Sequence, residues 1–255
     1  MKFLKSLQKA VLKYRRKSLA KEIFAKHKGV VQCGPFEGMH LNGVANISQA
    51  AHGLKIFGLY EEPVMKAMLE WCPTECLIDI GAGDGYYPVG MLKKNLVKRA
   101  ICFEMSESGQ VAIKTNAELN QVGGQVEILG AAGVDMADVL DQMKVPKEQT
   151  IILCDIEGAE FSLITKELIE KLSGAKFVIE LHEPIADGDN AKLRADLLAR
   201  FPDHYQTSIL VDSPRSWSGI KELEEMHDLD RALVTCEGRK FIGEWLFAEP
   251  KTSGS

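Results

Sequence analysis

Short apolar runs alternate with amphipathic stretches over most of the chain, from Cys76 to Phe247. The first five runs are short and mostly apolar, and each precedes a loop and in most cases a helix-like stretch: CLIDI, RAICFE, QVEIL, TIILCD and KFVIEL. Buried strands that alternate with helices are typical of βαβ units, in which helices cover both faces of a parallel sheet. The pattern therefore predicts an α/β fold.

The pattern changes toward the carboxyl end. Two further strand-like runs, YQTSILVD and GEWLFAE, are separated by a longer insertion from Ser213 to Arg239. Within this insertion LDRALVTCEGR fits a helix or a strand, and its periodicity does not decide between them. We expect residues 251–255, KTSGS, to form a disordered tail.

The first 28 residues form a basic segment with helical spacing. Apolar residues recur at intervals of three and four, and basic residues fall largely elsewhere on the same helix: Leu4, Leu7, Val11 and Tyr14 against Lys5, Lys9, Lys13 and Arg16. The spacing predicts a basic amphipathic helix over residues 1–28. It could pack on its own domain or on a second copy of the chain, or it could bind an anionic membrane transiently.

Residues 29–60 differ from both neighbours. They are rich in Gly and poor in charge and show no convincing period. We interpret them as loops and short turns that close over a ligand as a lid. A helix is predicted next, from Glu61 to Trp71, with Pro63 in its first turn, where a missing N–H is tolerated.

The composition is that of an ordinary globular protein. The 255 residues are 45% hydrophobic and 26% charged, and no apolar run approaches the roughly 18 residues that span a bilayer. Lys or Gln interrupts the apolar stretches near the start, which is unlike a secretory signal. Six Cys residues without a dense framework fit reduced thiols, and Cys72 and Cys76 lack the further ligands of a zinc site. We expect a cytoplasmic protein, with peripheral contact at the inner membrane face as an option for residues 1–28.

The charge is unevenly distributed. Residues 1–28 hold ten Lys and Arg and one acid, which leaves 21 basic and 35 acidic residues in the rest, a balance of −14. Proteins that bind nucleic acid normally present clustered Lys and Arg to the phosphates. The acidic body therefore argues against a nucleic-acid partner.

The most informative motif follows the first predicted strand. LIDIGAGDG places Asp79, Gly81, Gly83 and Gly85 at alternate positions after apolar residues. Glycines there let the backbone approach a ligand at the carboxyl end of a strand, where open α/β sheets bind their ligands. The dinucleotide fingerprint needs a further glycine where this chain has Tyr86, so nicotinamide binding is disfavoured.

A second element of the motif is Glu104, at the end of the next predicted strand. It lies nineteen residues beyond Gly85. An acid at this position can accept hydrogen bonds from both hydroxyls of a ribose, as in many nucleoside-binding sheets. Together with Asp79 and the glycines, it predicts a nucleoside-containing ligand.

These segments resemble a known family. LIDIGAGDGYY, CFE, IKTNAELN, ILCDIEGAEFSLI and FVIELHEP are similar to class I S-adenosylmethionine-dependent methyltransferases, in particular the FkbM-like group. The resemblance covers about residues 61–250, with CDIEGAE as its most specific part, so these residues are interpreted as a methyltransferase domain. It implies a Rossmann-like, mostly parallel sheet of seven strands, with an antiparallel last strand, GEWLFAE, beside KFVIEL.

The resemblance also implies the cofactor and some of its contacts. S-adenosylmethionine would be bound through the Asp79 to Gly85 loop and Glu104. Met105 would pack on the adenine. The chain departs from the pattern at Met105-Ser106, where the FkbM-like group usually has Pro.

Methyl transfer narrows the search for catalytic residues. The methyl group of a sulfonium is already activated, so the protein mainly aligns the reactants and accepts a proton from a hydroxyl acceptor. Acidic and imidazole side chains follow the fourth and fifth predicted strands: Asp155, Glu157, Glu160, Glu180, His182 and Glu183. His182 is the best general base by its ordinary pKa, although it could be an ion-paired loop residue. Asp155 with Glu157 or Glu183 could instead hold a divalent cation, and Glu160 suits the first turn of the next helix.

The acceptor is the least constrained part of the prediction. Methyltransferases that act on nucleobase amines carry Asn/Asp-Pro-Pro-aromatic after the fourth strand, where this chain has Asp155-Ile156-Glu157-Gly158. We therefore predict O-methylation of a sugar, polysaccharide or other small hydroxylated molecule, recognised by residues 29–60 and 212–240. Aminopropyl transfer, an NAD-dependent oxidoreductase and a catalytically inactive nucleotide-binding module remain as alternatives, and the oligomeric state is not predicted.

Overall fold

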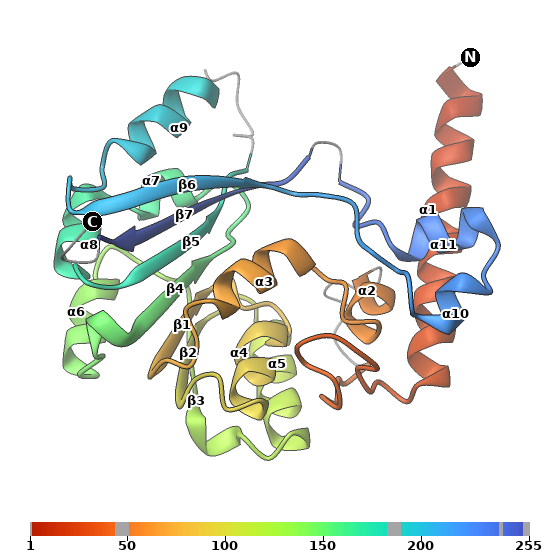
Figure 1. Cartoon of the computed structure of the whole chain (residues 1–255), viewed down its shortest axis with the longest axis horizontal. Coiled ribbons are helices and arrows are strands. Elements are labelled where there is room, and N and C mark those ends of the chain that lie inside the picture. The colour runs from red at the N-terminus through yellow and green to blue at the C-terminus, as the bar shows by residue number, and fades with distance from the viewer. Residues whose placement is uncertain (1, 44–50, 183–189, 240–241, 252–255) are drawn as a thin grey trace.

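A computed structural model describes residues 2–43, 51–182, 190–239 and 242–251. Its sheet has seven strands in the order β3-β2-β1-β4-β5-β7-β6 (Figure 1). In chain order the strands are β1 (Cys76–Ile80), β2 (Arg99–Phe103), β3 (Val126–Leu129), β4 (Thr150–Cys154), β5 (Lys176–Glu180), β6 (Tyr205–Val211) and β7 (Glu244–Pro250). Strands β1 to β5 pair in parallel, and β7 lies antiparallel between β5 and β6. The α/β fold and the antiparallel last strand beside β5 are confirmed.

The helices are short apart from the first. They are α1 (Lys2–Lys26), α2 (His52–Ile56), α3 (Glu62–Leu69), α4 (Tyr86–Lys93), α5 (Glu107–Leu119), α6 (Met136–Gln142), α7 (Glu160–Leu163), α8 (Lys166–Lys171), α9 (Asn190–Leu198), α10 (Lys221–Glu224) and α11 (Asp228–Val234), with two 3-10 turns, η2 (Gly123–Gln125) and η3 (Lys147–Gln149). The ambiguous LDRALVTCEGR segment thus contains a helix, α11. The helix predicted for residues 61–71 is confirmed as α3, slightly shorter at both ends.

Helices cover both faces of the sheet because the strands are apolar at consecutive positions. Leu77 of β1 faces a core shared with α3, α4 and α5, and Ile78 faces a core shared with α6, α8 and α9. Figure 1 shows these two groups of helices on opposite sides of the strands. With both faces covered, ligands can reach the parallel strands only at their ends, and the carboxyl ends of β1, β2 and β4 lie together.

The N-terminal helix is confirmed as α1, and among its described side chains those of the second half pack on the domain. Leu19 and Ile23 are 5% and 3% exposed and join the core on the α4 side of the sheet. Val11 and Tyr14, predicted to share the apolar face, are 57% and 75% exposed. Within the described residues, no helix is long and apolar enough to cross a membrane.

The segment predicted as a lid contributes to the core. Phe36 and Met39 are fully buried, and the Phe36 ring packs edge-on against Tyr86 at 5.2 Å between centroids. The same ring lies against Gly90, where a Cβ would be 2.3 Å from it. Residues 44–50 of this segment, and residues 252–255 of the predicted tail, lie outside the described residues.

Candidate functional site

A cavity of about 730 Å³ lies at the carboxyl ends of β1, β2 and β4. Its walls come mainly from the loops after these strands, with Lys55 and Tyr60 added by the segment before α3. Most of the predicted site residues line it: Asp79, Gly81, Gly83, Glu104, Met105, Asp155 and Glu157. Gly85 and His182 lie beside the cavity and are not part of its lining.

The glycine loop is shaped by close contacts between backbones. Gly81 has a φ of +91°, and a Cβ there would lie 1.9 Å from the carbonyl oxygen of Asp155. A side chain at this position would force the loops after β1 and β4 apart. Gly85 ends the loop at the N-cap of α4, also in the left-handed region, and a Cβ there would lie 3.3 Å from Ile113 of α5. The spacing of the glycines therefore reflects two backbone requirements, close approach at Gly81 and the start of a helix at Gly85.

Glu104 extends from the end of β2 toward this loop. Its Oε2 accepts the backbone N–H of Gly83 at 2.9 Å, and its Oε1 accepts the N–H and hydroxyl of Ser106 at 2.8 and 2.7 Å. These bonds use three of roughly four acceptor positions of a carboxylate. The Ser106 oxygen also caps α5 by accepting the Gly109 N–H at 3.1 Å, but its hydroxyl proton can rotate away from Glu104 when a ligand donates there. Met105 is 83% exposed at the rim of the cavity.

Asp79 is buried at the end of β1. Its side chain is 3% exposed, and burial raises its pKa well above the ordinary value, helped by the negative charges of Asp155 and Glu61. A buried acid in such surroundings favours a proton or a ligand cation as its neighbour.

One buried ion pair in the cavity wall was not predicted from the sequence. The Lys55 ammonium donates to both carboxylate oxygens of Asp84, at 2.8 and 2.7 Å, and lies over the rings of Tyr60 and Tyr86. Lys55 is 3% exposed. Among the described residues that line the cavity, Lys55 is the only basic one, against five acids: Asp79, Asp84, Glu104, Asp155 and Glu157.

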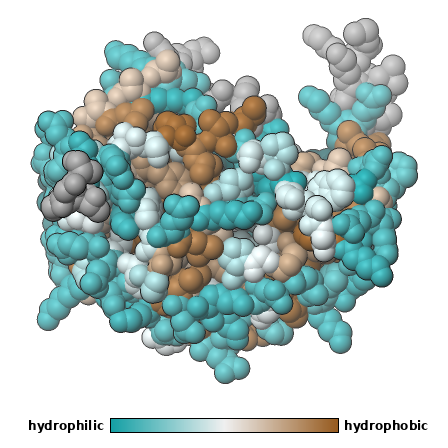
Figure 2. Space-filling view, in the orientation of Figure 1, coloured by the Kyte–Doolittle hydropathy of each residue, from teal (hydrophilic) through white to brown (hydrophobic). Residues whose placement is uncertain are grey.

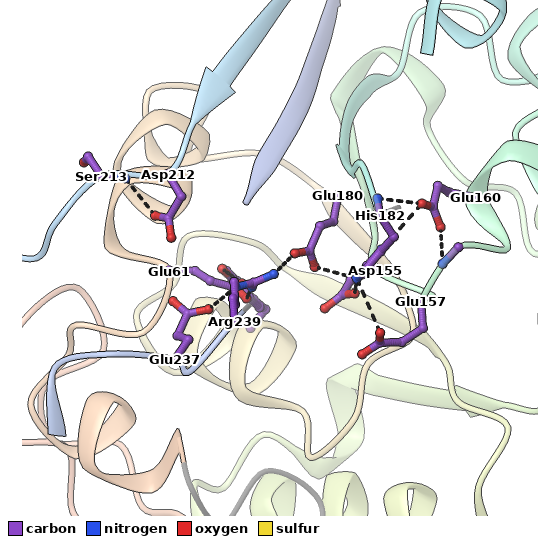
Figure 3. Close-up of polar contacts among 12 residues, drawn as sticks. Glu61, Asp155, Glu157, Glu160, Glu180, His182, Asp212, Ser213, Glu237 and Arg239 are labelled. Carbon is purple, nitrogen blue, oxygen red and sulfur yellow. Dashed lines mark hydrogen bonds and ion pairs between the residues drawn. The ribbon is translucent and has the colours of Figure 1, made fainter. Parts of the chain in front are cut away.

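His182 lies among carboxylates just after β5 (Figure 3). Its Nε2 is 3.5 Å from Asp155, 3.6 Å from Glu157 and 3.4 Å from Glu180. Burial alone would lower its pKa, but the carboxylates of Glu160, Asp155 and Glu157 outweigh burial and raise it. The predicted grouping of Asp155, Glu157 and His182 is therefore present at the edge of the cavity.

Glu160 has a structural place in this group. It is the first residue of α7 and fully buried, and it accepts the backbone N–H groups of His182 at 2.9 Å and Gly158 at 2.8 Å. Burial opposes ionisation, yet the hydrogen bonds from His182 and the backbone lower its pKa. Its predicted position in the first turn of the helix is confirmed. Glu183, another predicted candidate, lies outside the described residues.

A second group of charges adjoins the first and was missed by sequence reasoning. Arg239, at the end of the insertion, donates to Glu61 at 3.0 Å, to Glu237 at 2.6 Å, and to Glu180 (Figure 3). Glu61 also accepts the Tyr87 hydroxyl at 2.7 Å. In the sequence, Glu61 marked only a helix start, and Arg239 only the end of an insertion of undecided structure.

In both groups the carboxylates outnumber the basic side chains, and several of these carboxylates are buried. Burial raises the pKa of Glu61 to about 8 and of Glu180 to about 7, with further contributions from neighbouring carboxylates. The pKa of Asp155 is raised well above its ordinary value, first by burial and then by Glu180. In the part of the chain that the structure describes, two sets of side chains bring potential ligand atoms within 4.8 Å of one another: Asp155, Glu157 and His182, and Glu61, Asp155 and Glu180. The site can therefore hold protons or attract a positive charge.

Comparisons with known proteins bear on the fold. No protein-family model matches the chain. No curated protein matches it. Among solved structures, the O-methyltransferase from Bacillus cereus in complex with SAH is 14% identical, covers 92% of this chain and 91% of its own, and has a TM-score of 0.51.

A second solved structure gives the same result. The O-methyltransferase TomG from Streptomyces achromogenes, in complex with SAM, is 13% identical, covers 83% of this chain and 92% of its own, and has a TM-score of 0.55. At this identity the likeness concerns the arrangement of helices and strands. The chain thus has the Rossmann-like fold of these two O-methyltransferases, with helices on both faces of a seven-stranded sheet.

Proposed function

We propose that the chain is an S-adenosylmethionine-dependent methyltransferase that acts on a hydroxyl group of a sugar, polysaccharide or other small molecule. The observation that carries the proposal is the cavity at the ends of β1, β2 and β4, which brings the glycine loop, Asp79 and Glu104 together. Open α/β sheets bind nucleoside-containing ligands at this place. The resemblance of the CDIEGAE segment to the FkbM-like group supports the same proposal.

The cavity fits this cofactor in size and charge. Ligand cavities commonly measure about 300–1,000 Å³, which includes the 730 Å³ found here. The cofactor carries two positive groups, a sulfonium and an ammonium, and one carboxylate. The acids of the wall suit the positive groups, and we assign Lys55 to the carboxylate. Glu104 would accept the ribose hydroxyls, with Ser106 giving up its side-chain bond.

The acceptor side is assigned to the carboxylate and imidazole group. Bound S-adenosylmethionine supplies an electrophilic methyl group, so the remaining task is to orient a hydroxyl and take its proton. Asp155 lines the cavity, and the Nε2 of His182 lies 3.5 Å from its carboxylate, outside the cavity lining. In this proposal Asp155 and Glu157 hold the acceptor hydroxyl, and the imidazole of His182 receives the proton directly or through Asp155.

Binding measurements test the cofactor assignment first. Calorimetry with S-adenosylmethionine, S-adenosylhomocysteine and NAD should give binding of the first two only. Glu104→Ala should weaken that binding about 10- to 100-fold, since hydrogen bonds to a charged group are worth about 1.5–3 kcal/mol. Glu107→Ala is the matched control, because Glu107 is exposed on α5 and does not line the cavity. Equal binding by wild type and Glu104→Ala would refute the assignment.

Activity is tested with a radiolabelled methyl donor and a panel of glycans and small hydroxylated compounds. Transfer to one of these supports the proposal. Cofactor binding without transfer to any acceptor would favour the inactive binding module. Loss of activity with a chelator, restored by Mg²⁺ or Mn²⁺, would add a divalent cation near Asp155.

A further inference from the structure

The first half of α1 projects from the folded body. Arg15 pairs with Asp230 of α11 at 2.6 Å, and Arg16 donates to the carbonyl of Glu237 at 2.7 Å. Before these anchors, every described side chain, from residue 8 to residue 14, is exposed. At 1.5 Å per residue, residues 2–14 span about 20 Å of helix. Figure 1 shows this part standing clear of the sheet and its helices.

The apolar face of this projection points away from the domain. Successive residues are rotated by about 100° around the helix axis. The mean direction of Val11 and Tyr14 therefore lies roughly 150–160° around the axis from the mean direction of the buried residues Leu19, Ala20 and Ile23. Val11 and Tyr14 are accordingly 57% and 75% exposed. The domain that packs the second half of the helix therefore cannot cover this face. Figure 2 shows hydrophilic and hydrophobic side chains next to one another where the base of this projection meets the body.

The charge of the helix is opposite to that of the body. Residues 1–28 hold ten basic residues and one acid, whereas the rest of the chain has a balance of −14. Lys9 and Lys13 are exposed and lie, by the same helical spacing, roughly 130–170° from Val11 and Tyr14. An anionic surface would attract the helix and repel the body, so contact would be limited to the projection.

We propose that residues 2–14 bind the surface of an anionic membrane, with Val11 and Tyr14 buried at the boundary between headgroups and acyl chains. Lys9 and Lys13, on the opposite side of the helix, then lie at the level of the lipid phosphates. A basic helix with one apolar face is the form that binds bilayer interfaces. A nucleic acid would use the basic residues but leave Val11 and Tyr14 in water. A second copy would cover the apolar face but would bring two basic helices together. Only the membrane surface matches both faces, and the proposal does not depend on methyl transfer.

Sedimentation of the full chain with vesicles tests the proposal. At 0.1 M salt the chain should bind vesicles of phosphatidylcholine with 30% phosphatidylserine and should not bind phosphatidylcholine alone. Raising the salt to 0.5 M should weaken the binding. Each Lys or Arg near an anionic surface contributes a factor of about five, so Lys9→Gln with Lys13→Gln should weaken binding about 25-fold. Lys93→Gln with Lys94→Gln is the matched control, because both lysines are exposed on the body near the end of α4.

A separate variant tests whether the apolar face contributes to vesicle binding. Val11→Ser with Tyr14→Ser should abolish vesicle binding, whereas Val134→Ser, which changes a side chain that is 99% exposed on the body, should leave it unchanged. Far-UV circular dichroism and calorimetry with the methyl donor should be the same for all variants, which separates this proposal from the proposed function.

Three results would overturn the proposal. Vesicle binding that survives Val11→Ser with Tyr14→Ser would mean that the apolar face is not used. Sedimentation velocity that gives a dimer without lipid, dissociated by the same double variant, would assign the face to a second copy. If the chain bound single-stranded RNA through Lys9 and Lys13 and did not bind the anionic vesicles, the partner of the basic residues would be a nucleic acid.

Discussion

Replacement of Lys55 by Met tests both the energetics of the cavity wall and the proposed role of this residue. Lys55 and Asp84 form a pair whose side chains are 4% and 7% exposed, with two short contacts of 2.8 and 2.7 Å. Lys55→Met leaves the Asp84 carboxylate buried, with the N–H of Tyr86 at 3.2 Å as a weak remaining donor. Removing one partner of a buried pair typically lowers the free energy of unfolding by about 3–5 kcal/mol. We expect a loss of this size.

The double variant Lys55→Met with Asp84→Asn separates stability from binding. The amide that replaces the Asp84 carboxylate carries no charge, so urea unfolding should show that most of the lost stability returns. The affinity for S-adenosylhomocysteine should not return, because the proposed partner of its carboxylate is still missing. The loss should be about 10- to 100-fold, from about 1.5–3 kcal/mol for a charge-assisted hydrogen bond.

A truncated ligand gives the sharpest control. Methylthioadenosine contains the nucleoside and sulfur of S-adenosylhomocysteine without the amino-acid carboxylate. Calorimetry should show that the double variant binds methylthioadenosine as wild type does. Undiminished affinity for S-adenosylhomocysteine, or an equal loss for both ligands, would refute the assignment of Lys55.

Three further outcomes are expected. His182→Gln should lower kcat about 10²- to 10⁴-fold, and because the pKa of His182 is raised, the wild-type kcat should still be rising with pH above 6.5; a variant with full turnover and an unaltered pH–rate profile would exclude a base role. Burial raises the pKa of Glu61 from 4.5 to about 8. The stability that this carboxyl contributes is therefore fully present below its unfolded-state pKa and is lost as pH rises through 8. Urea unfolding should show a loss of about 2 kcal/mol between pH 6 and 8 from this group. Glu61→Gln should flatten the decline, and an unchanged slope would contradict the assignment. Gly81→Ala should lower the melting temperature and abolish cofactor binding, since its Cβ would meet the Asp155 carbonyl at 1.9 Å; normal thermal unfolding and binding would show that the loop adjusts.

The seven strands were predictable because their signal is local. Each strand is a run of four to seven residues, and in β1, β4 and β5 both faces are buried, so these runs are nearly all apolar. The glycine loop was also predictable from the sequence. The positive φ of Gly81 and Gly85 favours glycine for local steric reasons that do not depend on distant parts of the chain. The insertion was harder to interpret, because the helix α11 spans only seven residues and draws its burial from distant partners.

The N-terminal helix shows how a correct local prediction leaves the packing open. The spacing of Val11 and Tyr14 predicted the helix and its apolar face. The structure shows that a different face, with Leu19 and Ile23, packs on the domain. The pattern alone could not show this, because it does not distinguish an apolar face that meets the protein core from one that meets solvent or another partner.

The amino-acid sequence by itself determined the α/β architecture, the position of the candidate site at the strand ends, and the residues of the glycine loop with Glu104. Only the tertiary structure decided which charges share the site. Lys55 meets Asp84 across 29 residues, and Arg239 meets Glu61 across 178. Local periodicity reports whether a side chain faces the core, but the identity of its partner depends on how distant loops converge, and burial of those partners then sets their pKa values.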